Sequence, residues 1–106
     1  MSEYAITRPI DWPPTHPGEL FREILEDHVK LSVAEAAARM KISRQSLYSV
    51  LSGDSAVTAD MALRFGRLVG GAPELYVEMQ ARRDLWFAQQ RLQPILADIE
   101  PAVASE

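Results

Sequence analysis

Apolar residues recur at helical spacing along most of the 106-residue chain, and no stretch alternates apolar and polar positions as a half-buried strand would. Capping residues and helix breakers divide this pattern into five segments. The length suits one domain of common size with a single core. We therefore expect an all-α protein with helices at about 17–29, 33–40, 43–52, 58–69 and 73–93.

Three prolines oppose regular structure in residues 1–14, which are expected to form an extended N-terminal arm. Trp12 is expected to pack back against the domain. Pro17 suits the first position of a helix, so the first helix should begin there. Leu20 and Ile24 then line one face of that helix, with Phe21 and Leu25 adjacent, and we expect this face to be buried.

The segment 31–53 holds two short helices joined by a three-residue turn. Ser32 and Glu35 have the spacing of a capping box at the start of the first helix, and a run of small alanines follows. Ser43 offers the N-cap of the second helix, while Gly53 suits a left-handed end. Two capped short helices with a tight connection are the helix-turn-helix pattern.

The second of these helices, expected at about 43–52, has two different faces. Leu47, Val50 and Leu51 form its buried stripe, which leaves hydrogen-bonding side chains on the outer face. An ordinary solvated face would also be polar, but a recognition helix reads base edges with its N-terminal residues. Arginine pairs well with guanine and glutamine with adenine. The residues expected to face the DNA groove are Arg44, Gln45, Ser46, Tyr48 and Ser49.

Taken alone, the net charge of −4 argues against a polyanionic partner. However, the segment 30–53 contains four basic residues and one acidic residue, so it carries +3 while the rest of the chain carries −7. Neutralising phosphates needs a local basic patch more than a basic protein. We expect DNA binding that is modest for a monomer and strongly dependent on salt.

The last two helices are expected to close the domain, which should span 15–93. Thr58 caps the fourth helix, and a pair of glycines ends it. Pro73 begins the fifth helix, which Pro94 is expected to break. The remaining residues, 94–106, should form a fraying tail with a weak helical turn.

The fifth helix carries more apolar residues than one buried stripe can hold. The helix could wrap the core with the extra residues half exposed. We favour a partner interface, because exposed aromatic surface usually marks one. The simplest partner is a second copy, since helix-turn-helix modules commonly read two half-sites about 34 Å apart as symmetric dimers. The expected interface residues are Tyr76, Leu85, Trp86, Phe87 and Leu92.

Enzymatic, metal and membrane functions find no support in the sequence. There is no cysteine, which excludes disulfides and thiolate metal sites and fits a cytoplasmic location. The two histidines, His16 and His28, lack metal-site spacing, so we assign them to the start and end of the first helix. No apolar run approaches the roughly 20 residues that cross a bilayer, and the first residues lack a secretion signal. No cofactor is implied.

Four segments resemble successive parts of the HigA-type antitoxins, which belong to the Xre-like (lambda-repressor-like) DNA-binding family. The resemblance covers about residues 12–93, and its HPGE, TAD-x-ALR and LW-x-AQ motifs are more specific than the helix-turn-helix alone. The segments are HPGELFREIL at 16–25, LSVAEAAARMKISRQSLYSVLSG at 31–53, VTADMALRFGRLVGGAPELYVEMQ at 57–80 and DLWFAQQ at 84–90.

The resemblance implies a five-helix lambda-repressor-like domain that forms a homodimer and binds double-stranded operator DNA of its own operon. It also implies a cognate toxin, a small ribosome-dependent mRNA endonuclease that the antitoxin holds inactive. Carried over by position, Ser43 would also face the groove, while Ser32, Arg39 and Thr58 would lie near phosphates. We expect Lys41 to contact phosphate too, so that its loss weakens all DNA sequences alike.

The sequence departs from the family pattern at two places. Lys41 stands where many relatives have glycine in the turn, so either this side chain must tolerate a left-handed backbone or the turn differs from theirs. Val33 and Ala34 stand where many relatives place a phosphate-bracing glutamine, which predicts weaker operator affinity.

Two other functions stay open besides the antitoxin. A solitary helix-turn-helix regulator would keep this fold without a toxin partner. A neighbouring reading frame for a small basic protein would separate these two hypotheses. A purely structural interaction domain is a weaker third idea, because the outer face of the second short helix is so polar.

Overall fold

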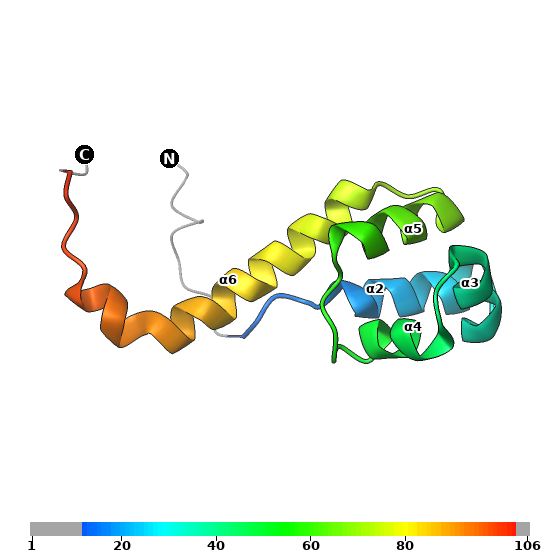
Figure 1. Ribbon diagram of the computed structural model, residues 1–106, viewed down its shortest axis with the longest axis horizontal. Coiled ribbons are helices and arrows are strands. Elements are labelled where there is room, and N and C mark those ends of the chain that lie inside the picture. The colour runs from blue at the N-terminus through cyan, green and yellow to red at the C-terminus, as the bar shows by residue number, and fades with distance from the viewer. Residues whose placement is uncertain (1–11, 104–106) are drawn as a thin grey trace.

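The computed structural model describes residues 12–103, and its regular elements there are all helical (Figure 1). The first helix continues without a break from an α-helical into a π-helical part, so this portion of the chain has five helices and confirms the expected all-α fold. The elements are α2 (Pro17–Glu23), η1 (Ile24–His28), α3 (Val33–Met40), α4 (Arg44–Leu51), α5 (Ala59–Val69) and α6 (Pro73–Asp98).

The helices α2 to α5 form a compact body from which α6 projects (Figure 1). Most of the expected arm lies outside the described residues, which begin at Trp12. The Trp12 side chain is 70% exposed, so the expectation that it packs against the domain is wrong. None of the helices between residues 12 and 103 is long and apolar enough to cross a membrane.

The helix starts follow the predicted caps. The Ser32 hydroxyl accepts from the Glu35 amide at 3.1 Å, and the Glu35 carboxylate accepts from the Ser32 amide at 3.0 Å. The hydrogen bond from the Ser32 backbone amide is the largest cause of a lowered pKa of the Glu35 carboxyl, and the Ser32 side chain adds to it. The hydroxyls of Ser43 and Thr58 cap α4 and α5 in the same way. Each cap satisfies an amide that the helix itself leaves unpaired.

The predicted helix-start role of His16 is also confirmed. Its Nδ1 atom accepts from the Gly18 amide at 2.8 Å, which makes it the N-cap of α2. Its Nε2 atom therefore carries the proton and donates to the Ser55 carbonyl at 3.0 Å. The buried imidazole thus joins the start of α2 to the loop that follows α4.

Three aromatic rings from three helices form the centre of the core. Phe21 of α2 stacks on Phe65 of α5, with ring centroids 3.7 Å apart. Tyr76 of α6 meets both rings edge-on, at 4.9 and 5.6 Å. Burial of Tyr76 raises the pKa of its hydroxyl. The prediction that Tyr76 belongs to a partner interface is therefore wrong, because its ring is enclosed by the chain's own core.

The buried face of the first helix differs by one position from the expected one. Phe21 and Leu25 are buried, while Leu20 and Ile24 are only half-buried. Both pairs have the four-residue spacing of a helical stripe, so the local pattern allows either. Packing selects the stripe with the phenylalanine, because that ring meets the aromatic rings of α5 and α6.

The end of the last helix also differs from expectation. Residues 94–98 continue α6 through Pro94 instead of forming a tail. A proline inside a helix removes one hydrogen bond and favours a kink, but the helix can resume beyond it. In Figure 1, the C-terminal part of α6 bends away from the direction of its first part. The prediction that Pro94 ends the helix is therefore wrong.

Replacing Phe65 with alanine should lower the free energy of unfolding by about 3–5 kcal/mol, because it empties the centre of the aromatic cluster. Urea denaturation at a fixed protein concentration measures this change. Tyr48→Ala is the matched control, since it removes an exposed aromatic ring and should shift stability by only about 0.5 kcal/mol. Equal effects of the two substitutions would contradict the assigned core.

Gly18→Ala should destabilise the protein by about 1–3 kcal/mol, because a methyl group there would overlap the backbone carbonyl oxygen of Val50. Helix propensity alone predicts the opposite sign, since alanine favours a helix over glycine by up to about 1 kcal/mol. Thermal unfolding of the variant distinguishes the two. A stabilised variant would show that α2 does not need this close approach to α4.

Candidate nucleic-acid interface

The helices α3 and α4 are joined by a tight turn with a left-handed residue. Lys41 has φ 64° and ψ 41°, so its side chain does tolerate the left-handed backbone predicted for it. The amide of Lys41 donates to the Ala38 carbonyl at 3.2 Å, and the amide of Ile42 donates to the Ala37 carbonyl at 3.0 Å. These two bonds form a Schellman motif that turns the chain into α4.

The helix α4 has one buried and one exposed face, as its sequence predicts. Leu47, Val50 and Leu51 are buried in the core. The exposed face is polar and lies at the N-terminal end of the helix, where a recognition helix presents side chains to bases. Its exposed residues include Arg44, Gln45, Ser46 and Tyr48, while base contact by these residues remains a prediction.

Three serines of the predicted base-contact set, Ser43, Ser46 and Ser49, already have hydrogen-bond partners within the protein. The Ser43 hydroxyl accepts from the Ser46 amide at 3.0 Å and donates to the Ser46 hydroxyl at 2.9 Å. Ser49 is half-buried, and its hydroxyl shares a hydrogen bond with that of Ser55. These bonds orient α4 and its following loop, so any base contact by Ser43 or Ser49 would have to share these hydroxyls.

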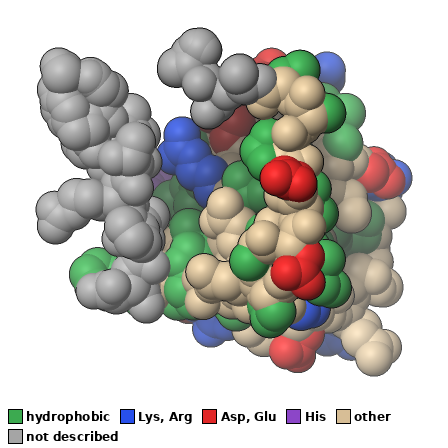
Figure 2. Space-filling view, turned by 90° about the vertical axis from the view of Figure 1, so that its left-hand side faces the viewer, with side chains coloured by type: hydrophobic (Ala, Val, Ile, Leu, Met, Phe, Trp, Pro, Cys, Tyr) green, Lys and Arg blue, Asp and Glu red, His purple; other side chains and the backbone are tan. Residues whose placement is uncertain are grey.

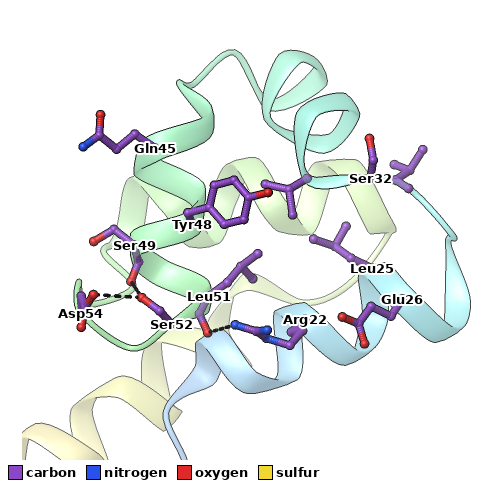
Figure 3. Close-up of a pocket in the computed structure, with 12 residues that line it drawn as sticks. Arg22, Leu25, Glu26, Ser32, Gln45, Tyr48, Ser49, Leu51, Ser52 and Asp54 are labelled. Carbon is purple, nitrogen blue, oxygen red and sulfur yellow. Dashed lines mark hydrogen bonds between the residues drawn. The ribbon is translucent and has the colours of Figure 1, made fainter.

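An open groove of about 560 Å³ lies between the first helix and α4. The Tyr48 ring lies across this groove with its hydroxyl toward Ser32, while Gln45 points outward (Figure 3). On the opposite wall, Arg22 donates to the Leu51 carbonyl at 3.1 Å and so holds the C-terminal end of α4. Glu26 adds a negative charge to this wall. The groove is therefore not uniformly basic.

The predicted phosphate-contact residues are exposed but do not form one cluster. Ser32 and Thr58 cap α3 and α5, and the amides at a helix N-terminus favour anions. Ser32 lines the same groove as Tyr48. Arg39 instead lines a second hollow of about 590 Å³ between α3, α5 and the start of α6, where Arg64 and Arg67 also lie.

Three positioning contacts were not predicted from the sequence. Gln80 of α6 accepts from the Val57 amide at 2.7 Å and donates to Asp84 at 2.9 Å, which fixes the loop between α4 and α5. Arg83 donates to the Pro14 carbonyl at 2.8 Å. Arg64 binds the end of α3, as described below. A glutamine four residues after the buried Tyr76 was the available signal for Gln80.

Apolar side chains remain on the outside of α6. Leu85 is 61% exposed, Phe87 is exposed, and Trp86 and Leu92 are half-buried. The Trp86 and Phe87 rings meet edge-on with centroids 5.1 Å apart, and the Arg83 guanidinium lies 5.0 Å from the Phe87 centroid. Seen toward the C-terminal end of α6, apolar side chains reach the surface among polar ones (Figure 2).

Metal ligation finds no support in the described residues, where no group of three histidines and carboxylates could hold an ion. The fold and the exposed face of α4 together define an all-helical, lambda-repressor-like helix-turn-helix protein. No family model matches the chain. Its family follows instead from its similarity to individual proteins and solved structures.

A virulence-associated protein I from Dichelobacter nodosus is 33% identical over 85 residues, which are 80% of this chain and 79% of that protein. The structure of an addiction module antidote protein of a HigA family from Coxiella burnetii has a TM-score of 0.76 at 30% identity. It covers 85% of this chain and 99% of that one. The Pseudomonas aeruginosa antitoxin HigA, solved with the higBA promoter, has a TM-score of 0.75 at 28% identity and covers 91% and 100%.

The chain therefore belongs to the HigA family, which confirms the resemblance found in its sequence. Its relatives are antitoxins and helix-turn-helix regulators, so the expectation that the chain is not an enzyme is confirmed as well.

Proposed function

We propose that this protein is the DNA-binding antitoxin of a type II toxin–antitoxin module. It represses its own operon through α4 and neutralises a small mRNA endonuclease toxin. The observation that carries the proposal is the polar, exposed N-terminal half of α4, whose opposite face is locked into the core. A related antitoxin solved with promoter DNA supports it. Operator binding places the protein in the cytoplasm.

In this proposal, Arg44 and Gln45 read base edges, because their side chains leave the first turn of α4 and are exposed. Ser46 and Tyr48 extend this contact along the helix, with Ser43 and Ser49 at its margins. Ser32 and Thr58 bind phosphates at helix N-termini, and Arg39 and Lys41 add positive charge. The contacts to phosphate position α4, while the contacts to bases provide specificity.

Arg44→Ala should cost about 1–3 kcal/mol of binding free energy at one base position, whereas Lys41→Ala should weaken all sequences alike and reduce the salt slope by about one. Fluorescence anisotropy on the protein's own upstream region, with single base-pair changes and a salt series, measures both. Arg82→Ala on α6 is the control, since it removes an exposed charge away from α4. The groove assignment is wrong if Arg44→Ala and Lys41→Ala both bind like the unchanged protein.

Toxin neutralisation is supported by the match to antitoxins over nearly their whole length. Co-expression with the adjacent gene, followed by pull-down and a translation assay, should show a complex in which the toxin is inactive. The alternative is a solitary regulator without a toxin; a relative from Haemophilus influenzae, 27% identical to this chain, is named only as a helix-turn-helix transcriptional regulator. The solitary-regulator hypothesis is favoured if the adjacent gene product does not bind this protein.

We also propose a homodimer through the projecting part of α6. Leu85, Ala88, Leu92 and Ile95 of α6 recur at alternating spacings of three and four residues. This is the spacing of a coiled-coil seam. Trp86 and Phe87 add aromatic surface beside the seam. Tyr76 is excluded from the dimer interface because it lies in the core. A symmetric dimer would present two copies of α4 to half-sites about 34 Å apart.

Leu85→Glu should convert the dimer into a monomer of 11.9 kDa, because it places a charge in the seam without touching the core. Sedimentation equilibrium measures the mass, and operator affinity should fall with it. Leu63→Glu is the matched control, since both leucines are 61% exposed but Leu63 lies on α5. A protein that is monomeric without any substitution, or a dimer lost only in Leu63→Glu, would contradict the seam.

A further inference from the structure

A residue of α5 holds the turn of the helix-turn-helix. The Arg64 Nη1 atom donates to the Met40 carbonyl at 2.7 Å and to the Lys41 carbonyl at 3.3 Å. Its Nε atom donates to the Asp60 carboxylate at 2.9 Å, one turn earlier on α5. One guanidinium therefore connects α5 to the C-terminal end of α3 across more than twenty residues of sequence.

The turn needs this support because of its left-handed residue. Lys41 carries a side chain where glycine would be unstrained, so its conformation costs free energy. The Schellman bonds satisfy the carbonyls of Ala37 and Ala38, but the next carbonyls, including those of Met40 and Lys41, point out of the end of α3. Arg64 donates to both of these. A planar guanidinium with several donors suits this task.

We propose that Arg64 is a positioning residue for DNA binding, which holds the left-handed turn so that α4 presents Arg44 at the correct place. The proposal rests on the proposed operator binding. Lys41 lies two residues before Ser43, the N-cap of α4, so a change in the turn moves the start of that helix. In this proposal Arg64 acts through the backbone, to which its Nη1 donor is bound, while its Nε donor is bound to Asp60.

Arg64→Met should weaken operator binding by about tenfold, roughly the effect of losing a charged hydrogen bond. It should also reduce the difference in affinity between the four base pairs at the position read by Arg44. Asp60→Ala removes the exposed ion pair but keeps the carbonyl bonds, so binding should change by less than about twofold. Arg67→Met is the charge-matched control from the same hollow. If Arg64→Met folds poorly, Arg64→Lys is the second variant. It retains a donor for Met40, so its operator affinity should lie between those of Arg64→Met and the unchanged protein.

A double-mutant cycle tests the mechanism. In a Lys41→Gly background, the left-handed turn is unstrained, so Arg64→Met should cost only about threefold in affinity. In a Lys41→Ala background, which removes the same charge but keeps the Cβ atom, the loss should stay near tenfold. An equal loss in the two backgrounds would overturn the proposal. So would a salt slope reduced by about one in Arg64→Met, because that marks a phosphate contact.

The same cycle in urea unfolding, without DNA, separates this proposal from the proposed function. If the unchanged protein does not bind its upstream DNA, operator binding fails. The clamp, by which we mean the hydrogen bonds of Arg64 to the Met40 and Lys41 carbonyls, is then still supported when Arg64→Met destabilises the Lys41→Ala protein more than the Lys41→Gly protein. Equal destabilisation overturns the clamp whatever the DNA result. DNA binding that is unchanged in Arg64→Met, with normal binding by the parent protein, overturns the positioning role alone.

Discussion

The contact on which the rest of the structure depends is the stack of Phe21 on Phe65, with Tyr76 against both rings. It joins the first helix to the last two helices of the chain and so places α2, α5 and α6 relative to one another. Because interiors are close-packed, these rings leave little freedom in how the helices can sit. Each of the three helices then supplies a contact to the helix-turn-helix, so the aromatic cluster determines where α4 lies.

Those supporting contacts come from different sides. The first helix approaches the end of α4 at Gly18, and Arg22 donates to the Leu51 carbonyl. From α5, Arg64 holds the turn that precedes α4, and from α6, Gln80 holds the loop that follows it. The hydrogen bonds of Arg22 and Arg64 satisfy carbonyls near helix ends. Gln80 satisfies a buried amide, which would cost free energy if it were unpaired. These contacts together fix the position of α4, although this helix has only eight residues.

Charge is arranged to match this position of α4. The chain has a net charge of −4, but basic residues gather in and around the helix-turn-helix. Acidic residues are not excluded from it, since Glu26 and Asp54 line the groove beside α4. In the proposed complex, these carboxylates disfavour phosphates in the groove, which favours an approach in which the N-terminal half of α4 meets the DNA.

The sequence alone determined the local features, because each depends on residues three or four positions apart. The capping box at Ser32 and the caps at Ser43 and Thr58 are examples, as is the two-faced pattern of α4. Only the tertiary structure decided which of two equivalent stripes on the first helix is buried, that Tyr76 belongs to the core, and that Arg64 binds the turn. These outcomes depend on packing between segments more than twenty residues apart, and local periodicity carries no information about such partners. Pro94 was misjudged for a different reason: a proline weakens a helix locally, but the flanking turns can still continue it.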